Sequence, residues 1–318
     1  MPAVSGERVW SIPDLRSPAR ATELLERVRS DPDGRLVVDL TQVQQIYPNG
    51  AVPFAATLAH LQSSHEVDVL LGAGSRMSHL SQPMTLDKYE RYGDTPLTHS
   101  VWRYGSEKEA QRLTNMFMEA LTDQVACEEG VIDSITWCLY EVLDNVFQHS
   151  RAEAGYVMMQ LHREHRRCAI AVADTGIGIQ KSLFLTRAAS VEILRDPGAS
   201  INHSLQQGVT SKGGENQGNG LFGLRRAVEI NGGRLTVRSG WGEWRLRDGE
   251  VSWDSDRRRP LVDKEDHQAT LVDWQLDCSS KVRIDDALGW PKSLGSELLE
   301  SIEDDSGVHR ISVMDLEE

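Results

Sequence analysis

The chain has 318 residues and a formal net charge of −14, with 34 Lys and Arg against 48 Asp and Glu. This length predicts two domains and is enough to bury a hydrophobic core. The acidic balance does not favour a nucleic-acid surface, and no apolar run reaches the roughly 18 residues of a membrane helix. The opening MPAVSGERVW lacks a signal-peptide pattern, so we expect a cytoplasmic protein with no nucleic-acid or membrane partner.

The N-terminal third has the pattern of a small α/β module. RLVVDL at 35–40 indicates a short buried strand, residues 51–62 a helix, and VDVLLG at 67–72 a second strand. This β, loop, α, β order, with TQVQQIYPNG before the helix, resembles a STAS domain, the phosphorylatable partner fold of bacterial sigma-factor switches. We place this STAS-like domain at residues 1–100.

The STAS resemblance has one departure at the position where the switch proteins carry a phosphoacceptor. A Ser precedes the helix glycine in that family, whereas Asn49 precedes Gly50 here. An amide cannot accept a phosphoryl group as a hydroxyl does. The resemblance therefore implies an interaction role for this domain and leaves its regulation open.

A turn-rich stretch at 92–105 separates this module from the next, which begins with a helix at 109–121. A second helix carries Glu141, Asn145 and His149 at a spacing of four, which places neighbours only about 40° apart around the helix axis. Its other face is apolar and predicts packing on a sheet through Ile135, Leu139, Val142, Val146 and Phe147.

The polar line of this helix suits either of two interpretations. A carboxylate at Glu141 can accept a proton from water, and an amide oxygen at Asn145 can bind Mg²⁺. The alternative is an ordinary solvated helix face.

The segment CAIAVADTGIGI predicts a buried strand that ends at Asp174. Gly176 and Gly178 allow a sharp turn and the close approach of a flat ligand. One carboxylate can accept a hydrogen bond from an exocyclic amine. A capped turn before a helix is the competing interpretation.

Helical periodicity then continues to Leu194 and ends at residues 196–198, and the polar, glycine-bearing stretch after it predicts a loop. Lys212 in this stretch is either a phosphate donor or a solvated loop lysine.

The segment GGENQGNGLFGL is glycine-rich and then becomes helical, ending at Gly232. The free N–H groups at such a helix start favour phosphate. The segment matches G-x-G-x-x-G literally, but no strand leads directly into it, and the chain contains no G-x-x-x-x-G-K-[ST].

Taken together, these three motifs in this order resemble the GHKL ATPases, which include gyrases, chaperones, histidine kinases and mismatch-repair ATPases. The acid-x-x-x-Asn-x-x-x-His-Ser form is most similar to bacterial regulatory ATPases and anti-sigma-factor kinases. We place this domain at residues 101–279. The resemblance implies an α/β protein in which a GHKL (Bergerat) two-layer sandwich, with a mixed sheet and helices on one face, follows the STAS-like domain.

The resemblance also implies a role for each matching residue. Glu141 would be the catalytic base, Asn145 the magnesium ligand, and Asp174 the reader of the adenine amino group. His149 we expect to be structural. The other expected nucleotide contacts are Gly176, Gly178 and Thr270 around the base, and Lys212, Gly218, Asn219, Gly220 and Leu221 around the phosphates. The family usually has Gly before that Thr, where this chain has Ala269.

From this resemblance we expect an ATP- and Mg²⁺-binding regulatory ATPase whose nucleotide state controls contacts with a protein partner, either its own STAS-like domain or another regulator. Two alternatives stay open: an anti-sigma-type protein serine kinase, and a nucleotide-dependent interaction module without turnover. Related regulators often form dimers, so a homodimer is also open.

The remaining features concern the thiols and the C-terminus. Cys127, Cys138, Cys168 and Cys278 lie far apart in sequence without a C-x-x-C pair, which predicts reduced, mostly buried thiols. Residues 280–318 form an acidic tail, in which residues 296–318 hold eight acids against one base. Such a tail is either a solubilising end or a segment for partner binding.

Overall fold

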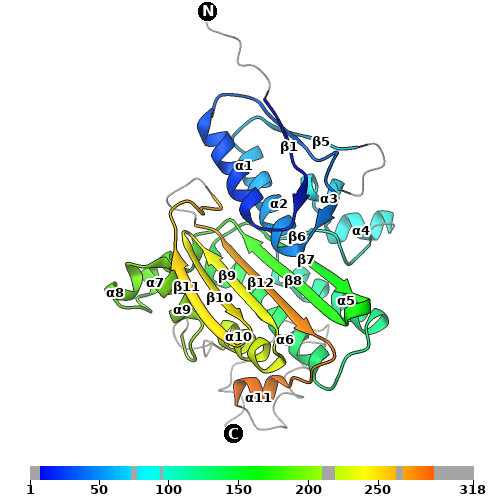
Figure 1. Ribbon diagram of the computed structural model, residues 1–318, viewed down its shortest axis with the longest axis vertical. Coiled ribbons are helices and arrows are strands. Elements are labelled where there is room, and N and C mark those ends of the chain that lie inside the picture. The colour runs from blue at the N-terminus through cyan, green and yellow to red at the C-terminus, as the bar shows by residue number, and fades with distance from the viewer. Residues whose placement is uncertain (1–7, 73–76, 94–95, 210–218, 263–267, 290–318) are drawn as a thin grey trace, which may run out of the picture.

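The computed structural model describes residues 8–72, 77–93, 96–209, 219–262 and 268–289. It contains a small parallel sheet from the N-terminal module and a large sheet from the rest of the chain (Figure 1). The expected contacts at Lys212 and Gly218, and most of the acidic tail, lie outside the described residues.

The N-terminal module is built on a three-stranded parallel sheet in the order β1, β3, β5. Its predicted strands and helix are confirmed, although the helix begins at Pro48, where a proline is well tolerated because the first helical N–H has no partner. The elements of this part are β1 (Arg8–Ser11), β2 (Asp14–Leu15), α1 (Ala19–Ser30), β3 (Leu36–Asp39), β4 (Gln45–Ile46), α2 (Pro48–Gln62), β5 (Val67–Leu70), α3 (Ser78–Ser81) and α4 (Leu86–Tyr92).

The large sheet has seven strands in the order β11, β10, β9, β12, β8, β7, β6. Its strands are β6 (Trp102–Tyr104), β7 (Gly155–His162), β8 (Arg167–Asp174), β9 (Arg234–Ser239), β10 (Gly242–Arg247), β11 (Glu250–Ser255) and β12 (Thr270–Asp277). Every pair of neighbours within it is antiparallel, so the prediction of a mixed sheet is wrong for the described strands. Short turns join β7 to β8 and β9 through β11, and such turns connect only antiparallel neighbours.

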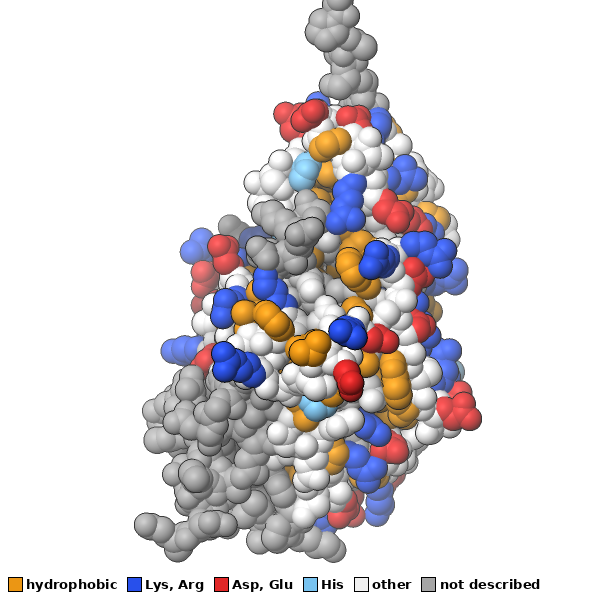
Figure 2. All heavy atoms as spheres, turned by 90° about the vertical axis from the view of Figure 1, so that its left-hand side faces the viewer, with side chains coloured by type: hydrophobic (Ala, Val, Ile, Leu, Met, Phe, Trp, Pro, Cys, Tyr) orange, Lys and Arg blue, Asp and Glu red, His pale blue; other side chains and the backbone are white. Residues whose placement is uncertain are grey.

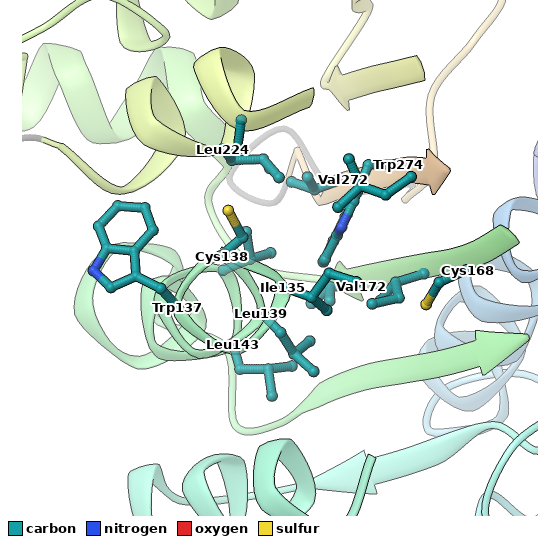
Figure 3. Packing of buried hydrophobic residues seen from close by; sticks show 14 of the residues in the cluster. Ile135, Trp137, Cys138, Leu139, Leu143, Cys168, Val172, Leu224, Val272 and Trp274 are labelled. Atoms are coloured by element: carbon teal, nitrogen blue, oxygen red, sulfur yellow. The ribbon is translucent and has the colours of Figure 1, made fainter. Parts of the chain in front are cut away.

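One face of the large sheet is covered by helices of the same part of the chain: α5 (Glu107–Gln124), α6 (Val131–Asn145) and α10 (Gly220–Asn231). Figure 3 shows Ile135, Leu139 and Leu143 of α6 among the side chains that meet Val172 and Trp274 of the sheet. The predicted apolar face of α6 is therefore confirmed.

The opposite face of the same sheet is covered at β7 and β8 by α2 of the N-terminal module. The outward side chains of β8 there are Ala171 and Ala173, which are small enough for a helix to approach closely. Residues on all sides of α2 are buried, as expected for a helix that is apolar all round. The expected two layers thus become three where the N-terminal module covers the sheet.

Short helices connect β8 to β9 along the chain, and the sequence predicted them only in part. The periodicity up to Leu194 forms two helices, α7 (Gly178–Thr186) and α8 (Val191–Leu194), not one. The loop predicted after residues 196–198 is wrong for its first part, because α9 (Pro197–Ser204) extends into it. The Asp196 carboxylate caps this helix by accepting from Gly198 N–H and Ala199 N–H.

Three further elements complete the described chain: a π-helix, η1 (Val146–Ser150), a 3₁₀ turn, η2 (Arg163–His165), and α11 (Ile284–Leu288). The last packs outside α10 and α6, where Leu288 and Trp137 meet Gly223. The start of the expected acidic tail is therefore docked on the helical layer.

Figure 2 faces the side of the molecule that lies at the left of Figure 1, where α7, α8 and β11 are found. Hydrophobic side chains are scattered there among Lys, Arg, Asp and Glu, and the described part of this face carries no large patch of one charge. None of the helices in the described residues combines the length and hydropathy that crossing a membrane requires.

Candidate functional site

The strand register brings Asp174 and Thr270, two residues that are predicted to contact the base, side by side in one row. Asp174 at the end of β8 pairs with Thr270 of β12, which pairs in turn with Ser239 of β9. On the other side Asp174 pairs with Gly155 of β7. Because side chains alternate along a strand, this row faces the helical layer, as Val172 and Val272 do.

Asp174 is almost completely buried, with 6% of its surface exposed. Burial raises its pKa to about 7, and the hydrogen bond that Oδ1 accepts from Gly176 N–H, at 2.7 Å, opposes this only in part. The described residues thus supply the carboxyl with one hydrogen-bond donor. A buried acid in this state gains from a further donor such as an exocyclic amine.

The turn after Asp174 requires its first glycine. A Cβ on Gly176 would overlap the carbonyl oxygen of Ser150, and Ile177 N–H donates to the same oxygen at 2.8 Å. The carbonyl oxygen of Gly176 in turn accepts from the N–H groups of Gln268 and Ala269. The glycine therefore joins the end of β8 to η1 and to the start of β12.

The second glycine of the turn, Gly178, begins α7 with a left-handed φ of 75°. A Cβ there would lie 2.7 Å from Ser239 Oγ, which itself accepts from Ile179 N–H at 2.8 Å. Ala269 also adopts a left-handed φ, of 55°. This backbone conformation favours glycine, which gives a physical reason for the Gly that the GHKL pattern has at this position.

Glu141 and the start of α10 meet although nearly 80 residues separate them in sequence. A Cβ on Gly220 would lie 2.6 Å from Glu141 Oε2, so the carboxylate reaches the first turn of α10 only because this residue is glycine. Among the described residues, the N-cap residue Asn219 makes no side-chain capping bond. The N–H groups of Gly220 and Leu221 at this turn are thus placed to bind an anion.

The helical face predicted for Glu141, Asn145 and His149 is regular only in its first part. The α-helix ends at Asn145, and residues 146–150 form the π-helix η1. The angular spacing of residues in a π turn differs from that in an α turn, so the regular α-helical spacing predicted for this line ends at Asn145, and the placement of His149 on the same face stays a prediction. Glu141 and Asn145 remain one α-helical turn apart, and both are half-buried.

Two residues of the site were missed by sequence reasoning. Tyr104 of β6 lies over Gly155, where a Cβ would overlap its ring, and its hydroxyl donates to the carbonyl oxygen of Leu143 at 3.3 Å. Its pKa is raised by burial and by the neighbouring charges of Asp174 and Asp144. Ser239 is the other, because its Oγ donates to the carbonyl oxygen of Ala269 while it holds α7. No motif marks either residue, since strand register alone brings them to the row.

In the described part of the chain, no group of three or more His, Cys, Asp or Glu side chains is arranged to hold a metal ion. The single amide of Asn145 is not a group of that kind. Its oxygen would hold a hard cation only together with ligands from another molecule, such as phosphate oxygens.

The structure also places Asn49, the residue at the expected phosphoacceptor position. It lies in the first turn of α2, half-buried, and its Oδ1 is buried without a hydrogen-bond partner in the described residues. Gly50 beside it packs against the backbone of Leu15, where a Cβ would overlap the carbonyl oxygen.

Comparison with known families identifies the part of the chain that contains this site. Residues 130–251 match the family described as histidine kinase-, DNA gyrase B-, and HSP90-like ATPase. These residues therefore form a GHKL ATPase domain. The match includes Glu141, Asn145, Asp174 and Gly220, and the N-terminal module lies outside it.

Comparisons with whole proteins add little to this. A comparison with curated proteins finds no match. Among solved structures, the crystal structure of full-length ShkA in complex with AMPPNP is similar, with 13% identity over 84% of this chain and 47% of that chain. The TM-score is 0.27, at which the likeness carries no argument about fold or ligand. The chain spans about half the length of that protein.

Proposed function

We propose that the GHKL domain binds ATP, with the adenine amino group donating to the carboxyl of Asp174. Two observations support this proposal. Residues 130–251 match the ATPase family, and the buried carboxyl of Asp174 accepts a hydrogen bond from a single donor among the described residues. Thr270 lies directly beside Asp174 in the sheet, and its hydroxyl would contact the same base. Gly176 and Gly178 lie in the turn that follows Asp174 and are proposed as the backbone contacts of the base.

The phosphates are proposed to lie at the first turn of α10. The N–H groups of Asn219, Gly220 and Leu221 would donate to them, and a helix of 12 residues adds a favourable dipole worth about 0.3–1 kcal/mol per charge. Lys212 and Gly218 are proposed as further phosphate contacts from the segment before this helix.

Glu141 and Asn145 are the proposed catalytic pair. Asn145 Oδ1 would bind Mg²⁺, and the ion when bound would neutralise phosphate charge. Glu141 reaches the N-terminus of α10 through the space that Gly220 leaves, so its carboxylate lies beside the proposed phosphate position. From there it would accept the proton of an attacking water.

The proposed regulatory partner is the chain's own N-terminal module. Asp174 ends β8 on the helical face, while Ala173, the residue before it, lies on the opposite face under α2. A shift of β8 when nucleotide binds would therefore act directly on α2. An interaction role of this kind agrees with Asn49, which offers no hydroxyl for phosphorylation.

The observation that supports the proposal most strongly is the position of Glu141 Oε2, which lies so close to Gly220 that a Cβ on this residue would overlap it. It can be tested with ATP labelled at the terminal phosphate, incubated with wild type and with Glu141→Gln. We expect free labelled phosphate from wild type, a rate about 10²–10⁴ lower from the variant, and unchanged ATP binding.

The same experiment separates the two alternatives. Label retained on protein would favour the anti-sigma-type serine kinase. Binding without any product in wild type would favour an interaction module without turnover. Equal rates of phosphate release from wild type and variant would end the assignment of Glu141 as the base.

A further inference from the structure

Three of the four cysteines come together at the end of the large sheet that lies away from the candidate site. Cys168 is near the start of β8, and Cys278 directly follows β12. Cys127 lies in the connection between α5 and α6. The sequence did not predict that these cysteines lie close together, because their proximity depends on β12 lying beside β8.

Cys127 and Cys278 are held against each other by side-chain and backbone contacts. The side-chain hydrogen bond between the two thiols is the largest influence on the pKa of each. Next to them, Glu128 N–H donates to the carbonyl oxygen of Cys278 at 2.8 Å. The Arg166 guanidinium donates to the carbonyl oxygens of both Ala126 and Cys278, at 2.8 and 3.5 Å. These contacts fix the two chain segments that carry the thiols next to each other.

The two thiols differ in exposure and acidity. Cys127 is half-buried, and its pKa is lowered by the hydrogen bond from the Cys278 thiol and by the charge of Arg166, against the effect of burial. Cys278 is fully buried, and the same hydrogen bond, together with burial, raises its pKa. Cys127 is therefore the accessible nucleophile and Cys278 the inner thiol.

We propose that Cys127 and Cys278 are an oxidant-sensitive pair that closes to an intramolecular disulfide on reaction with hydrogen peroxide. The Cys127 thiolate sulfur attacks one peroxide oxygen, the O–O bond breaks, and a sulfenic acid forms while the departing oxygen takes a proton and leaves as water. Cys278 sulfur then attacks the sulfenic sulfur, so that an S–S bond forms and the S–O bond breaks. The hydroxyl leaves as a second water with the Cys278 proton.

The balance of this reaction is two electrons. Two thiols are oxidised to one disulfide, and one hydrogen peroxide is reduced to two waters. The product would tie the connection before α6 to the end of β12. A dithiol reductant would reverse it.

The test uses the full chain treated with hydrogen peroxide in slight excess, then unfolded for thiol titration and intact mass. We expect two of the four thiols to disappear in wild type, with a mass loss of two hydrogens and full recovery after dithiothreitol. Peptide mapping should join Cys127 to Cys278. Cys278→Ser should instead accumulate a sulfenic acid at Cys127 that dimedone traps.

Cys138→Ser is the matched control, because Cys138 is also buried but lies on α6 facing α10, where Figure 3 places it near Leu224. It should lose two thiols as wild type does, whereas Cys127→Ser should lose none. The proposal is overturned if all wild-type thiols survive, if the disulfide joins Cys127 to Cys168, or if it links two chains.

Discussion

Replacing Asp174 by Asn should stabilise the protein without ligand and remove its proposed adenine reader. The folded-state pKa of Asp174 is about 7, against an ordinary value of 3.8, because the buried carboxylate loses hydration. For an acid with a raised pKa, stability is fully present below pH 3.8 and is lost as the pH rises through about 7. At 1.36 kcal/mol per pKa unit, this carboxyl lowers the free energy of unfolding by up to about 4 kcal/mol at pH 8, where it is ionised, and by about 2 kcal/mol at pH 5.5, where folding keeps it protonated.

Asp174→Asn avoids this cost and keeps an oxygen that can accept from Gly176 N–H. The free energy of unfolding in urea should therefore rise in the variant by up to about 4 kcal/mol at pH 8, and by about half as much at pH 5.5. ATP affinity should fall about 10- to 100-fold, because an amide N–H group would face the adenine amine.

Asp273→Asn is the matched control on the neighbouring strand. Asp273 also has a pKa raised to about 7 by burial, but it pairs with Ala171 on the face turned away from the site. This variant should also gain stability as the pH rises and should keep its ATP affinity. The reasoning is refuted if Asp174→Asn is less stable than wild type at pH 8, or if both variants bind ATP as wild type does.

Three further substitutions test the packing around the site. Gly220→Ala should displace the Glu141 carboxylate and slow phosphate release at least about tenfold. The thermal midpoint should change little, because the displaced atom is at the end of a flexible side chain. An unchanged rate of phosphate release would contradict the placement of Glu141. Gly176→Ala should lower the free energy of unfolding by about 1–3 kcal/mol, because the new methyl group meets the backbone oxygen of Ser150; urea unfolding measures this, and wild-type stability would disprove the close contact. Ala173→Leu should cost a similar amount by pushing α2 off the sheet and should speed amide hydrogen exchange in α2; unchanged exchange there would show that α2 does not depend on this contact.

Much of the local structure could be predicted from the sequence because its signals are local. The helical spacing of apolar residues such as Ile135 and Leu139 predicted the apolar face of α6. The run of apolar residues before Asp174 indicated a strand buried on both sides. Motif spacing also placed Glu141 and Asn145 one turn apart. Their chemical roles, and those of the other site residues, stay predictions.

What the sequence could not predict depends on contacts between distant segments. The π turn after Asn145 leaves no clear periodic signal, so the sequence did not show that the α-helix ends at that residue. Tyr104 and Ser239 reach the site only through the register of β6 and β9 with their neighbours. The position of α2 across β7 and β8 likewise follows from tertiary packing, in which small alanines on β8 leave room for the helix.

Isothermal titration calorimetry with ATP and Mg²⁺, on wild type and on Asp174→Asn at pH 8, tests the central claim most directly. The account predicts saturable binding of one nucleotide per chain by wild type and at least tenfold weaker binding by the variant. The absence of binding heat in wild type at several temperatures, or equal affinities for the two proteins, would contradict it.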